Sequence, residues 1–392
     1  MQASQPTFSE YADIRFTTGL SIIIPTYKEV ENIPHILARL DLVRQTYGLL
    51  LEVLFVDDSS DDGSVEAVMA AGHDWARIIV RTENRGLSPS VIDGFAAAQY
   101  PILICMDCDL SHPPEQIPQM ILGLNAGQQM MIGSRYVPGG STDDDWGFLR
   151  WLASAAATVM ARPLTPVSDP MSGFFAIRKA DFDAAKDLNP IGYKIMLELI
   201  VKCRFENVGE VPIHFSDRVR GTSKLTVSEQ LKYIQHLRRL YLYRFANAMH
   251  LAQFLVVGAL GVVVNLCVLT LLLFLGLPEA ICLAGGIVVS VGSNFLLNRR
   301  LTFSYARHRP VGHQFVGFLG ASAVGAGVSF MVSLVLRTQV LGAASYGLHL
   351  AALGGIACGM IFNYLGSRFL VFRKTYVRPR ESIAARAKAL FK

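Results

Sequence analysis

Residues 102–114, with the sequence Ile-Leu-Ile-Cys-Met-Asp-Cys-Asp-Leu-Ser-His-Pro-Pro, contain the pattern that decides the fold. The apolar run 102–106 predicts a short buried strand. Asp107 and Asp109 follow it at once, and two carboxylates at positions i and i+2 can converge if the chain turns there. An isolated Asp-x-Asp pair usually lies in a solvated loop, so its meaning depends on the ends of the neighbouring strands.

Two earlier apolar runs also end in acidic residues. The run 21–24 leads into Pro25-Thr26-Tyr27-Lys28-Glu29, and the run 53–56 leads into Asp57-Asp58-Ser59-Ser60-Asp61-Asp62-Gly63. Carboxylates gathered on one rim repel one another unless a cation neutralises them. Mg²⁺ prefers carboxylate and phosphate oxygens. The three acidic strand ends therefore predict a site for a divalent metal that carries a diphosphate.

The order of the predicted elements indicates the fold class. Strands are expected at 21–24, 53–56, 77–81, 102–106 and 130–133, with helices at 33–47, 63–71, 89–98 and 114–125. Strands that alternate with helices at this spacing form βαβ units and a mostly parallel sheet. Ligands of such sheets bind beyond the carboxyl ends of the strands, which is where the acidic residues lie.

Composition and charge separate the chain into two parts. Of 392 residues, 52% are hydrophobic and 17% charged, which excludes a disordered, collagen-like or small disulfide-rich protein. Residues 251–392 contain two acidic and 13 basic residues, against 29 acidic and 23 basic residues before them. The basic residues of the second part lie between long apolar runs. This arrangement favours a membrane and not a nucleic acid as partner.

Four apolar runs, 251–275, 279–297, 315–336 and 347–372, each have the length of about 20 residues that a membrane span requires. The loop 298–313 and the C-terminal tail are basic, so the positive-inside rule predicts that both termini and the first domain are cytoplasmic. The pattern Asn294-x₄-Arg299-x-Leu301-x-Phe303 recurs as Asn363-x₄-Arg368-x-Leu370-x-Phe372, which indicates two repeated hairpins. Asn294 and Asn363 either hydrogen-bond between helices or contact a lipid head group.

The segment 225–250 precedes the first span and is rich in Tyr, Leu and Arg. Such an amphipathic segment suits the membrane surface. Cys105 and Cys108 form a C-x-x-C with no second pair, so zinc is not expected. The expected organisation is a lead-in at 1–19, an α/β domain at 20–224, interfacial helices at 225–250, an all-α membrane domain of four spans at 251–375 and a basic cytoplasmic tail at 376–392.

Together these motifs resemble the family 2 glycosyltransferases of GT-A fold, and more narrowly the dolichol-phosphate mannose synthases. The four spans resemble the GtrA-like membrane family. The first resemblance covers residues 20–225 and rests on motifs in the family's order: Pro25-Thr-Tyr-x-Glu29, Val56-Asp-Asp58, Asp107-x-Asp109, Gly133-Ser-Arg-Tyr136, Trp146-Gly-x-x-Arg150, Asp169-x-x-Ser-Gly-Phe174, Gly192-Tyr-Lys194 and Arg218-x-x-Gly-x-Ser-Lys-Leu225.

The resemblance implies a role for each matching position. The residues implied to bind the nucleotide sugar are Pro25, Tyr27, Glu29, Val56, Asp58, Asp107, Cys108, Asp109, Arg218 and Lys224. The implied acceptor-phosphate residues are Arg135, Arg150 and Ser154, and the implied metal ligands for Mg²⁺ or Mn²⁺ are Asp107, Asp109 and Ser111. Ser111 stands where some relatives have a Gln. Asp109, Arg135 and Arg150 are the expected catalytic residues, and His112 is expected to be structural.

The expected reaction is inverting transfer of a hexose, most simply mannose from GDP-mannose, to a polyprenyl phosphate at the cytoplasmic membrane face. Arginine suits the acceptor phosphate because its planar fork binds two oxygens. One alternative is an undecaprenyl-phosphate glucosyltransferase that uses UDP-glucose. Another is a flippase for a lipid-linked sugar with an attached transferase.

Overall fold

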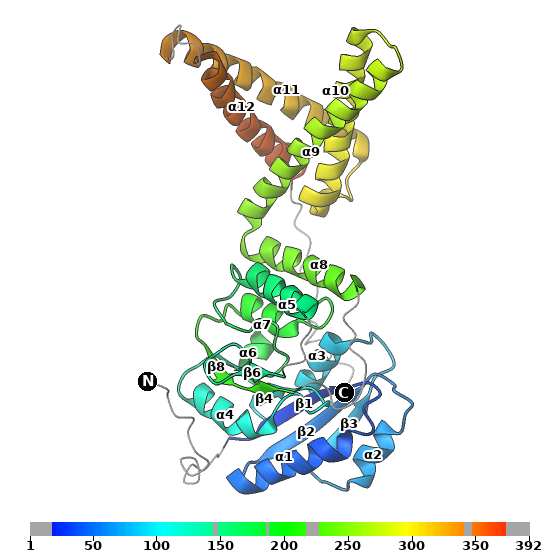
Figure 1. The fold of residues 1–392 in the computed structure, drawn as a ribbon, viewed down its shortest axis with the longest axis vertical. Helices are drawn as coiled ribbons and strands as arrows, with labels where there is room; N and C mark the ends of the chain where they lie inside the picture. The colour runs from blue at the N-terminus through cyan, green and yellow to red at the C-terminus, as the bar shows by residue number, and fades with distance from the viewer. Residues whose placement is uncertain (1–17, 144–147, 186–187, 217–226, 341–346, 374–392) are drawn as a thin grey trace. The chain divides into compact units, whose positions relative to one another are not determined.

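The computed structural model describes residues 18–143, 148–185, 188–216, 227–340 and 347–373. The chain forms two compact units, which meet in the sequence between Arg244 and Phe245. Each unit is described by itself below (Figure 1).

The first unit is built on a seven-stranded sheet in the order β3-β2-β1-β4-β7-β5-β8. All neighbouring strands are parallel except β7, which runs antiparallel to both β4 and β5. The prediction of a mostly parallel α/β sheet is therefore confirmed. The strands are β1 (Leu20–Thr26), β2 (Leu51–Asp57), β3 (Ala76–Val80), β4 (Ile102–Cys105), β5 (Met130–Ser134), β7 (Phe175–Arg178) and β8 (Val208–Pro212).

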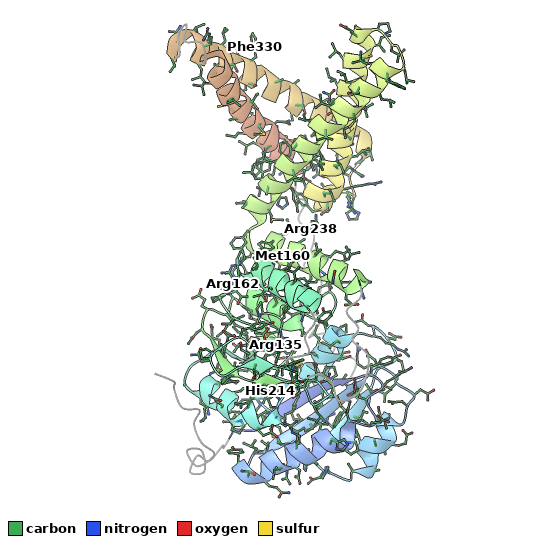
Figure 2. All side chains as sticks on the ribbon, viewed as in Figure 1. Arg135, Met160, Arg162, His214, Arg238 and Phe330 are labelled. Carbon is green, nitrogen blue, oxygen red and sulfur yellow. The ribbon has the colours of Figure 1, made fainter. Side chains whose placement is uncertain are left out.

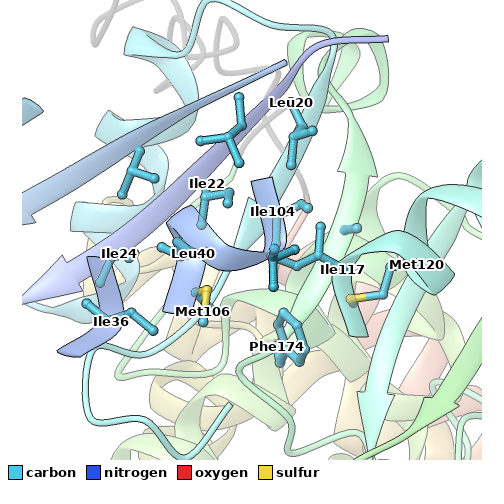
Figure 3. Close-up of a cluster of buried hydrophobic side chains, with 14 of the residues drawn as sticks. Leu20, Ile22, Ile24, Ile36, Leu40, Ile104, Met106, Ile117, Met120 and Phe174 are labelled. Carbon is cyan, nitrogen blue, oxygen red and sulfur yellow. The ribbon is translucent and has the colours of Figure 1, made fainter. Parts of the chain in front are cut away.

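Helices cover both faces of this sheet, so its central strands are apolar throughout. Along β1, Ile22 and Ile24 point into one core and Ile23 into the other, as the two-residue period of a strand requires. Figure 3 shows the first core, where β1 meets α1 (Ile33–Tyr47) and α4 (Ile117–Asn125). The second core lies under α3 (Leu87–Ala97) and α7 (Ile195–Lys202).

Two strands of the main sheet, β7 and β8, were not predicted from the sequence. Strand β7 has only four residues, and β8 contains Gly209 and Pro212. Gly and Pro weaken the strand pattern, and β8 can hold them because it lies at the edge of the sheet. A small second sheet pairs β6 (Ser141–Thr142) with β9 (His214–Phe215).

Three further helices complete the first unit: α5 (Phe148–Ala161), α6 (Lys179–Ala184) and α8 (Val227–Arg244), while α2 (Ser64–Ala70) follows β2. Tyr233, Leu237 and Leu240 on one face of α8 pack against α5 and α7 in a third apolar cluster. Leu231 and Ile234 of the same helix are exposed. The break after α8 falls at Phe245, so residues 246–250, expected in the interfacial segment, open the first apolar helix.

The second unit contains two helical hairpins, α9 (Ala246–Phe274) with α10 (Glu279–Leu297), and α11 (Val311–Val335) with α12 (Gly347–Gly366). Among the described residues, three helical segments are long and apolar enough to cross a membrane: Ala246–Phe274, Glu279–Thr302 and Val311–Val340. The 20-residue α12, the fourth expected span, packs along α11.

The repeated sequence pattern has a structural counterpart. Both hairpins end in a π-helical turn, Asn298–Thr302 and Ser367–Val371. The next residues, Phe303 and Phe372, are fully buried and stack on each other with ring centroids 4.8 Å apart. The two repeats therefore meet through the same position of each.

The repeated asparagines lie against glycines of the partner helix in each hairpin. A Cβ added to Gly261 would clash with the Asn294 amide, and a Cβ on Gly325 would clash with Asn363. Asn363 Oδ1 also accepts a hydrogen bond from Ser322 on α11, at 3.5 Å. For Asn363 the structure thus favours the role between helices.

Candidate active site

The turns that follow β1 and β2 are tied together by hydrogen bonds. The backbone N–H of Lys28 donates to Ser60 Oγ at 2.9 Å, and that of Val30 donates to Asp62 Oδ2 at 3.2 Å. Lys28, Ser59 and Asp61 adopt left-handed backbone conformations, with φ of 60°, 55° and 51°. Such conformations are uncommon outside glycine, and their grouping here marks turns held in shape by their surroundings.

The turn after β4 is held in the same way. Leu110 has φ of 65°, which is a strained value for a bulky side chain. This conformation brings Ser111 back onto Asp109: Ser111 N and Oγ both donate to Asp109 Oδ1, at 3.2 and 2.6 Å. The Ser111 hydroxyl, expected as a metal ligand, is thus bonded to Asp109. It orients this buried carboxylate.

The acidic side chains of the three turns converge around Cys108. Burial raises the pKa of the Cys108 thiol, and the negative charges of Glu29, Asp109, Asp107 and Asp62 raise it further. The thiol is therefore kept in its protonated form, and the four acidic residues that raise its pKa come from the turns after β1, β2 and β4.

Asp107 is the more accessible of the two aspartates, with 30% of its side chain exposed. Its backbone N–H donates to His112 Nδ1 at 2.9 Å, and the His112 ring is buried and stacked on Phe174. A Cβ on Gly173 would lie 3.6 Å from both Asp107 carboxylate oxygens, so a glycine keeps space beside them. The contacts of His112 agree with its expected structural role.

The residues expected to bind the nucleoside differ in accessibility. Tyr27 is 42% exposed, whereas the Val56 side chain lies in the core and leaves only its backbone for a ligand. Asp58 is buried and paired with Arg81, and it also accepts a hydrogen bond from Gly86 N at 2.6 Å. In this conformation Asp58 fixes the segment before α3.

Arg135, which is labelled in Figure 2, directly follows β5. It forms a buried ion pair with Asp169. Its Nε and one terminal nitrogen donate to the two oxygens of Asp169, at 2.7 and 2.8 Å. Burial alone would lower the pKa of Arg135, but the hydrogen bonds and charge of Asp169 outweigh it and raise the pKa. Glu210 on β8 accepts from the backbone of Ser168 and Asp169 and so holds this loop.

Ser154 lies on α5 and joins this side of the site. Its hydroxyl is 3.0 Å from the hydroxyl of Tyr136, the residue after Arg135. Arg150 precedes Ser154 by four residues on the same helix, which places both on one helix face. The side chain of Arg150, and all of Arg218 and Lys224, lie outside the described residues.

Lys194 is a further candidate that the sequence reasoning missed. Its ammonium donates to the Met171 carbonyl at 2.7 Å. Burial and the nearby Arg135 cation lower the pKa of Lys194 to about 7, although the negative charges of Asp169 and Asp107 oppose this shift. Lys194 and Asp169 both lie in sequence motifs, Gly192-Tyr-Lys194 and Asp169-x-x-Ser-Gly-Phe174. These motifs were the sequence features that could have identified the two residues. Neither motif indicated which partner its charged residue would meet.

The arrangement has two chemically distinct sides. Carboxylates gather beyond β1, β2 and β4, whereas Arg135 follows β5 with a second cationic residue, Lys194, nearby. In the described part of the chain, no three His, Cys, Asp or Glu side chains converge closely enough to hold a metal by themselves.

Comparison with known proteins agrees with both units. Residues 21–185 match the family described as glycosyl transferase family 2. Residues 253–372 match the family described as GtrA/DPMS, transmembrane domain. With the three long apolar helices, the second match shows that the chain is a membrane protein.

Several characterised relatives carry related names. The chain is 37% identical over 322 residues to a dolichol-phosphate mannosyltransferase of Pyrococcus furiosus. The aligned region covers 81% of this chain and 90% of that protein. It is 42% identical to the dolichol-phosphate mannosyltransferase of Saccharomyces cerevisiae, over 57% of this chain and 88% of that one. The polyprenol monophosphomannose synthase of Mycolicibacterium smegmatis is 34% identical over 55% of this chain and 84% of its own. The chain is thus a glycosyltransferase of family 2, with a GT-A domain and a GtrA-like membrane domain, and belongs to the dolichol-phosphate mannosyltransferase family.

Proposed function

We propose that this enzyme transfers mannose from GDP-mannose to a polyprenyl phosphate at the cytoplasmic face of a membrane. The observation that carries the proposal is the opposition of charges at one edge of the sheet. Four carboxylates raise the pKa of Cys108 by their negative charge, while Arg135 is held in place by Asp169 on the neighbouring side. The names of the relatives supply the sugar and the lipid class.

The carboxylate side fits a divalent ion shared with the donor diphosphate. Mg²⁺ is usually bound through one or two carboxylates together with substrate phosphates. Asp107 and Asp109 offer this number, and the absence of a third described ligand agrees with an ion that arrives with the nucleotide. Mg²⁺ or Mn²⁺ would there neutralise the charge that develops on the leaving diphosphate.

In this reaction the protein residues position the acceptor phosphate and do not act as a general base. The acceptor is a phosphate monoester whose second pKa is about 6, so near neutral pH it already carries a nucleophilic oxyanion. One of its oxygens forms a bond with the anomeric carbon as the bond from that carbon to the diphosphate breaks, and the electron pair leaves with the diphosphate. Attack from the opposite side inverts the anomeric configuration. His112 is not required as a base, because its Nδ1 accepts the backbone hydrogen of Asp107.

Arg135 is the cation that we assign to the acceptor phosphate. Two donors of its fork are bonded to Asp169 in this conformation. The phosphate therefore either approaches its remaining edge or displaces part of this pair. Arg150 and Ser154 on α5 would bind the same phosphate, and Arg218 and Lys224 the donor phosphates.

We also propose four membrane spans with both termini in the cytoplasm. The basic residues between α10 and α11 support this orientation through the positive-inside rule. Cysteine labelling from each side of sealed vesicles tests it in a background without the native cysteines. Arg307→Cys should react from the cytoplasmic side and Leu277→Cys from the opposite side. Labelling of both from one side would contradict the topology.

Product analysis tests the reaction itself. Purified full-length enzyme is incubated with polyprenyl phosphate and a panel of GDP- and UDP-sugars, with Mg²⁺, with Mn²⁺ or with excess EDTA. Mannosyl lipid formed only from GDP-mannose and only with metal is the expected result. Glucosyl lipid from UDP-glucose would instead identify an undecaprenyl-phosphate glucosyltransferase type.

A further inference from the structure

A groove with a volume of about 540 Å³ runs along the α11–α12 hairpin of the membrane unit. This volume lies within the range of about 300–1,000 Å³ that is common for small-molecule sites. At one end the groove is lined by Arg309 and His313, and further along by Gly317, Gly320, Gly366 and Leu370. It therefore has a cationic end and an apolar body.

The sequence forms this groove by placing small residues on facing surfaces. His313, Gly317 and Gly320 recur every three to four residues along α11, so they share one face of the helix. Gly366 faces Ala321 closely, since a Cβ on it would lie 3.0 Å from the Ala321 methyl. A Cβ on Gly320 would meet nothing within 4 Å. Gly320 therefore borders open space and does not serve close helix packing.

The electrostatics of the groove favour an anion at its end. From Phe245 to the C-terminus the chain contains only two acidic residues, Glu279 and Glu381, and neither lines the groove. Arg309 and His313 belong to the basic end of the hairpin, beside the loop that carries Arg299 and Arg307. Basic side chains next to a membrane attract anionic lipid head groups.

We propose that this groove holds an isoprenoid chain whose terminal phosphate lies at Arg309 and His313. The inference rests on the proposed function, because that reaction brings a single-chain lipid with one phosphate to this membrane. One cationic end and one apolar body match such a molecule. The groove would hold the acceptor lipid in the membrane unit before transfer. For transfer, the acceptor phosphate would leave Arg309 and His313 and bind at Arg135.

Photolabelling with a matched pair of variants tests the groove. Full-length enzyme in lipid nanodiscs is exposed to a polyprenyl phosphate that carries a diazirine on its chain, and labelled peptides are mapped by mass spectrometry. Gly320→Leu fills the open space of the groove. Gly327→Leu is the control, because Gly327 lies on the same helix outside the groove and its added Cβ also meets nothing within 4 Å.

We expect labels within 309–324 and 362–371 that decrease at least fivefold in Gly320→Leu and less than twofold in Gly327→Leu. Unlabelled polyprenyl phosphate should compete, whereas phosphatidylglycerol should not. Equal labelling of the two variants, equal competition by phosphatidylglycerol, or occupation of the groove by a second copy of the chain would each overturn the proposal.

A second readout keeps this proposal separate from the reaction. Both variants should transfer mannose to a short, water-soluble isoprenyl phosphate at the wild-type rate, within about twofold. For the long-chain acceptor, the KM of Gly320→Leu should rise about fivefold or more. If mannosyl transfer is normal but the groove is not labelled, the lipid-binding groove is rejected and the proposed function stands. Absence of transfer from every donor would reject the proposed function, whatever the labelling shows.

Discussion

The donor side and the acceptor side of the site carry opposite charges and hold them in different ways. On the donor side, Asp109 is oriented by Ser111, and the neighbouring carboxylates raise the pKa of Cys108. On the acceptor side, Arg135 already has a fully buried partner in Asp169. Under the proposed function, a metal and diphosphate would complete the donor side, whereas the acceptor side would be preorganised by the protein itself.

The largest effect on the rate of transfer is expected when a carboxylate of the donor side is replaced. Asp109→Asn should lower the rate of mannosyl transfer by about 10³-fold, or about 4 kcal/mol, because the metal and diphosphate lose a shared carboxylate. Asp41→Asn on α1, which removes a carboxylate bonded to Arg44 and Gln45, is the control and should leave transfer unchanged. Near-normal turnover of a folded Asp109→Asn enzyme would contradict the assignment.

Breaking the acceptor side should have the next largest effect. Arg135→Ala leaves Asp169 buried without its partner, so it should lower stability by about 3–5 kcal/mol as well as lowering transfer about 100-fold. Arg135→Lys retains charge without the planar fork and should restore stability more than activity.

A second arginine offers a matched comparison for this pair. Arg39 forms the same two-bond fork with Glu115, but about a third of each side chain is exposed. Arg39→Ala should therefore cost less than about 1 kcal/mol. Thermal and chemical unfolding measure the loss of stability in each variant. Equal losses in Arg135→Ala and Arg39→Ala would show that burial does not strengthen the Arg135 ion pair.

A smaller effect is expected from Lys194, which lies near residues of both sides. Its pKa in the folded chain is about 7, against its usual 10.5. Between about pH 7 and pH 10 the unfolded chain therefore binds a proton that the folded chain lacks, so the wild-type stability should rise with pH. In Lys194→Met this rise should be shallower, while the exposed Lys232→Met should match the wild type. Parallel melting-temperature curves for all three proteins would contradict the pKa shift.

The smallest change is expected at His112. His112→Gln should keep transfer within about threefold, because the ring accepts a backbone hydrogen bond and is not needed as a base. Activity of wild type and variant should fall below about pH 6, where the acceptor phosphate takes up its second proton. A phosphonate acceptor with a higher pKa should move this limb upward. If His112→Gln is inactive and the loss of activity at low pH does not shift with the phosphonate acceptor, the protein supplies the base.

The sequence predicted the acidic edge because strand ends and carboxylates are local features. Asp107 and Asp109 follow an apolar run, and any parallel sheet brings such ends to one edge. It did not predict that Arg135 pairs with Asp169, because these residues lie 34 positions apart in the chain. Asp169 also precedes β7, a strand of four residues that the sequence did not predict. The membrane helices were predictable from length and composition, whereas their breaks, such as the one at Phe245, depend on tertiary packing.

The antiparallel strand β7 has a consequence for the spacing of the two sides. Cys105 on β4, Phe175 on β7 and Ile132 on β5 form one row across the sheet. Adjacent strands lie about 4.8 Å apart, so the strands that lead to Asp107 and Arg135 are separated by about 10 Å. This width is set by backbone hydrogen bonds alone. Under the proposed assignment, the spacing between the donor and acceptor sides would therefore follow from the order of the strands and not from the loops.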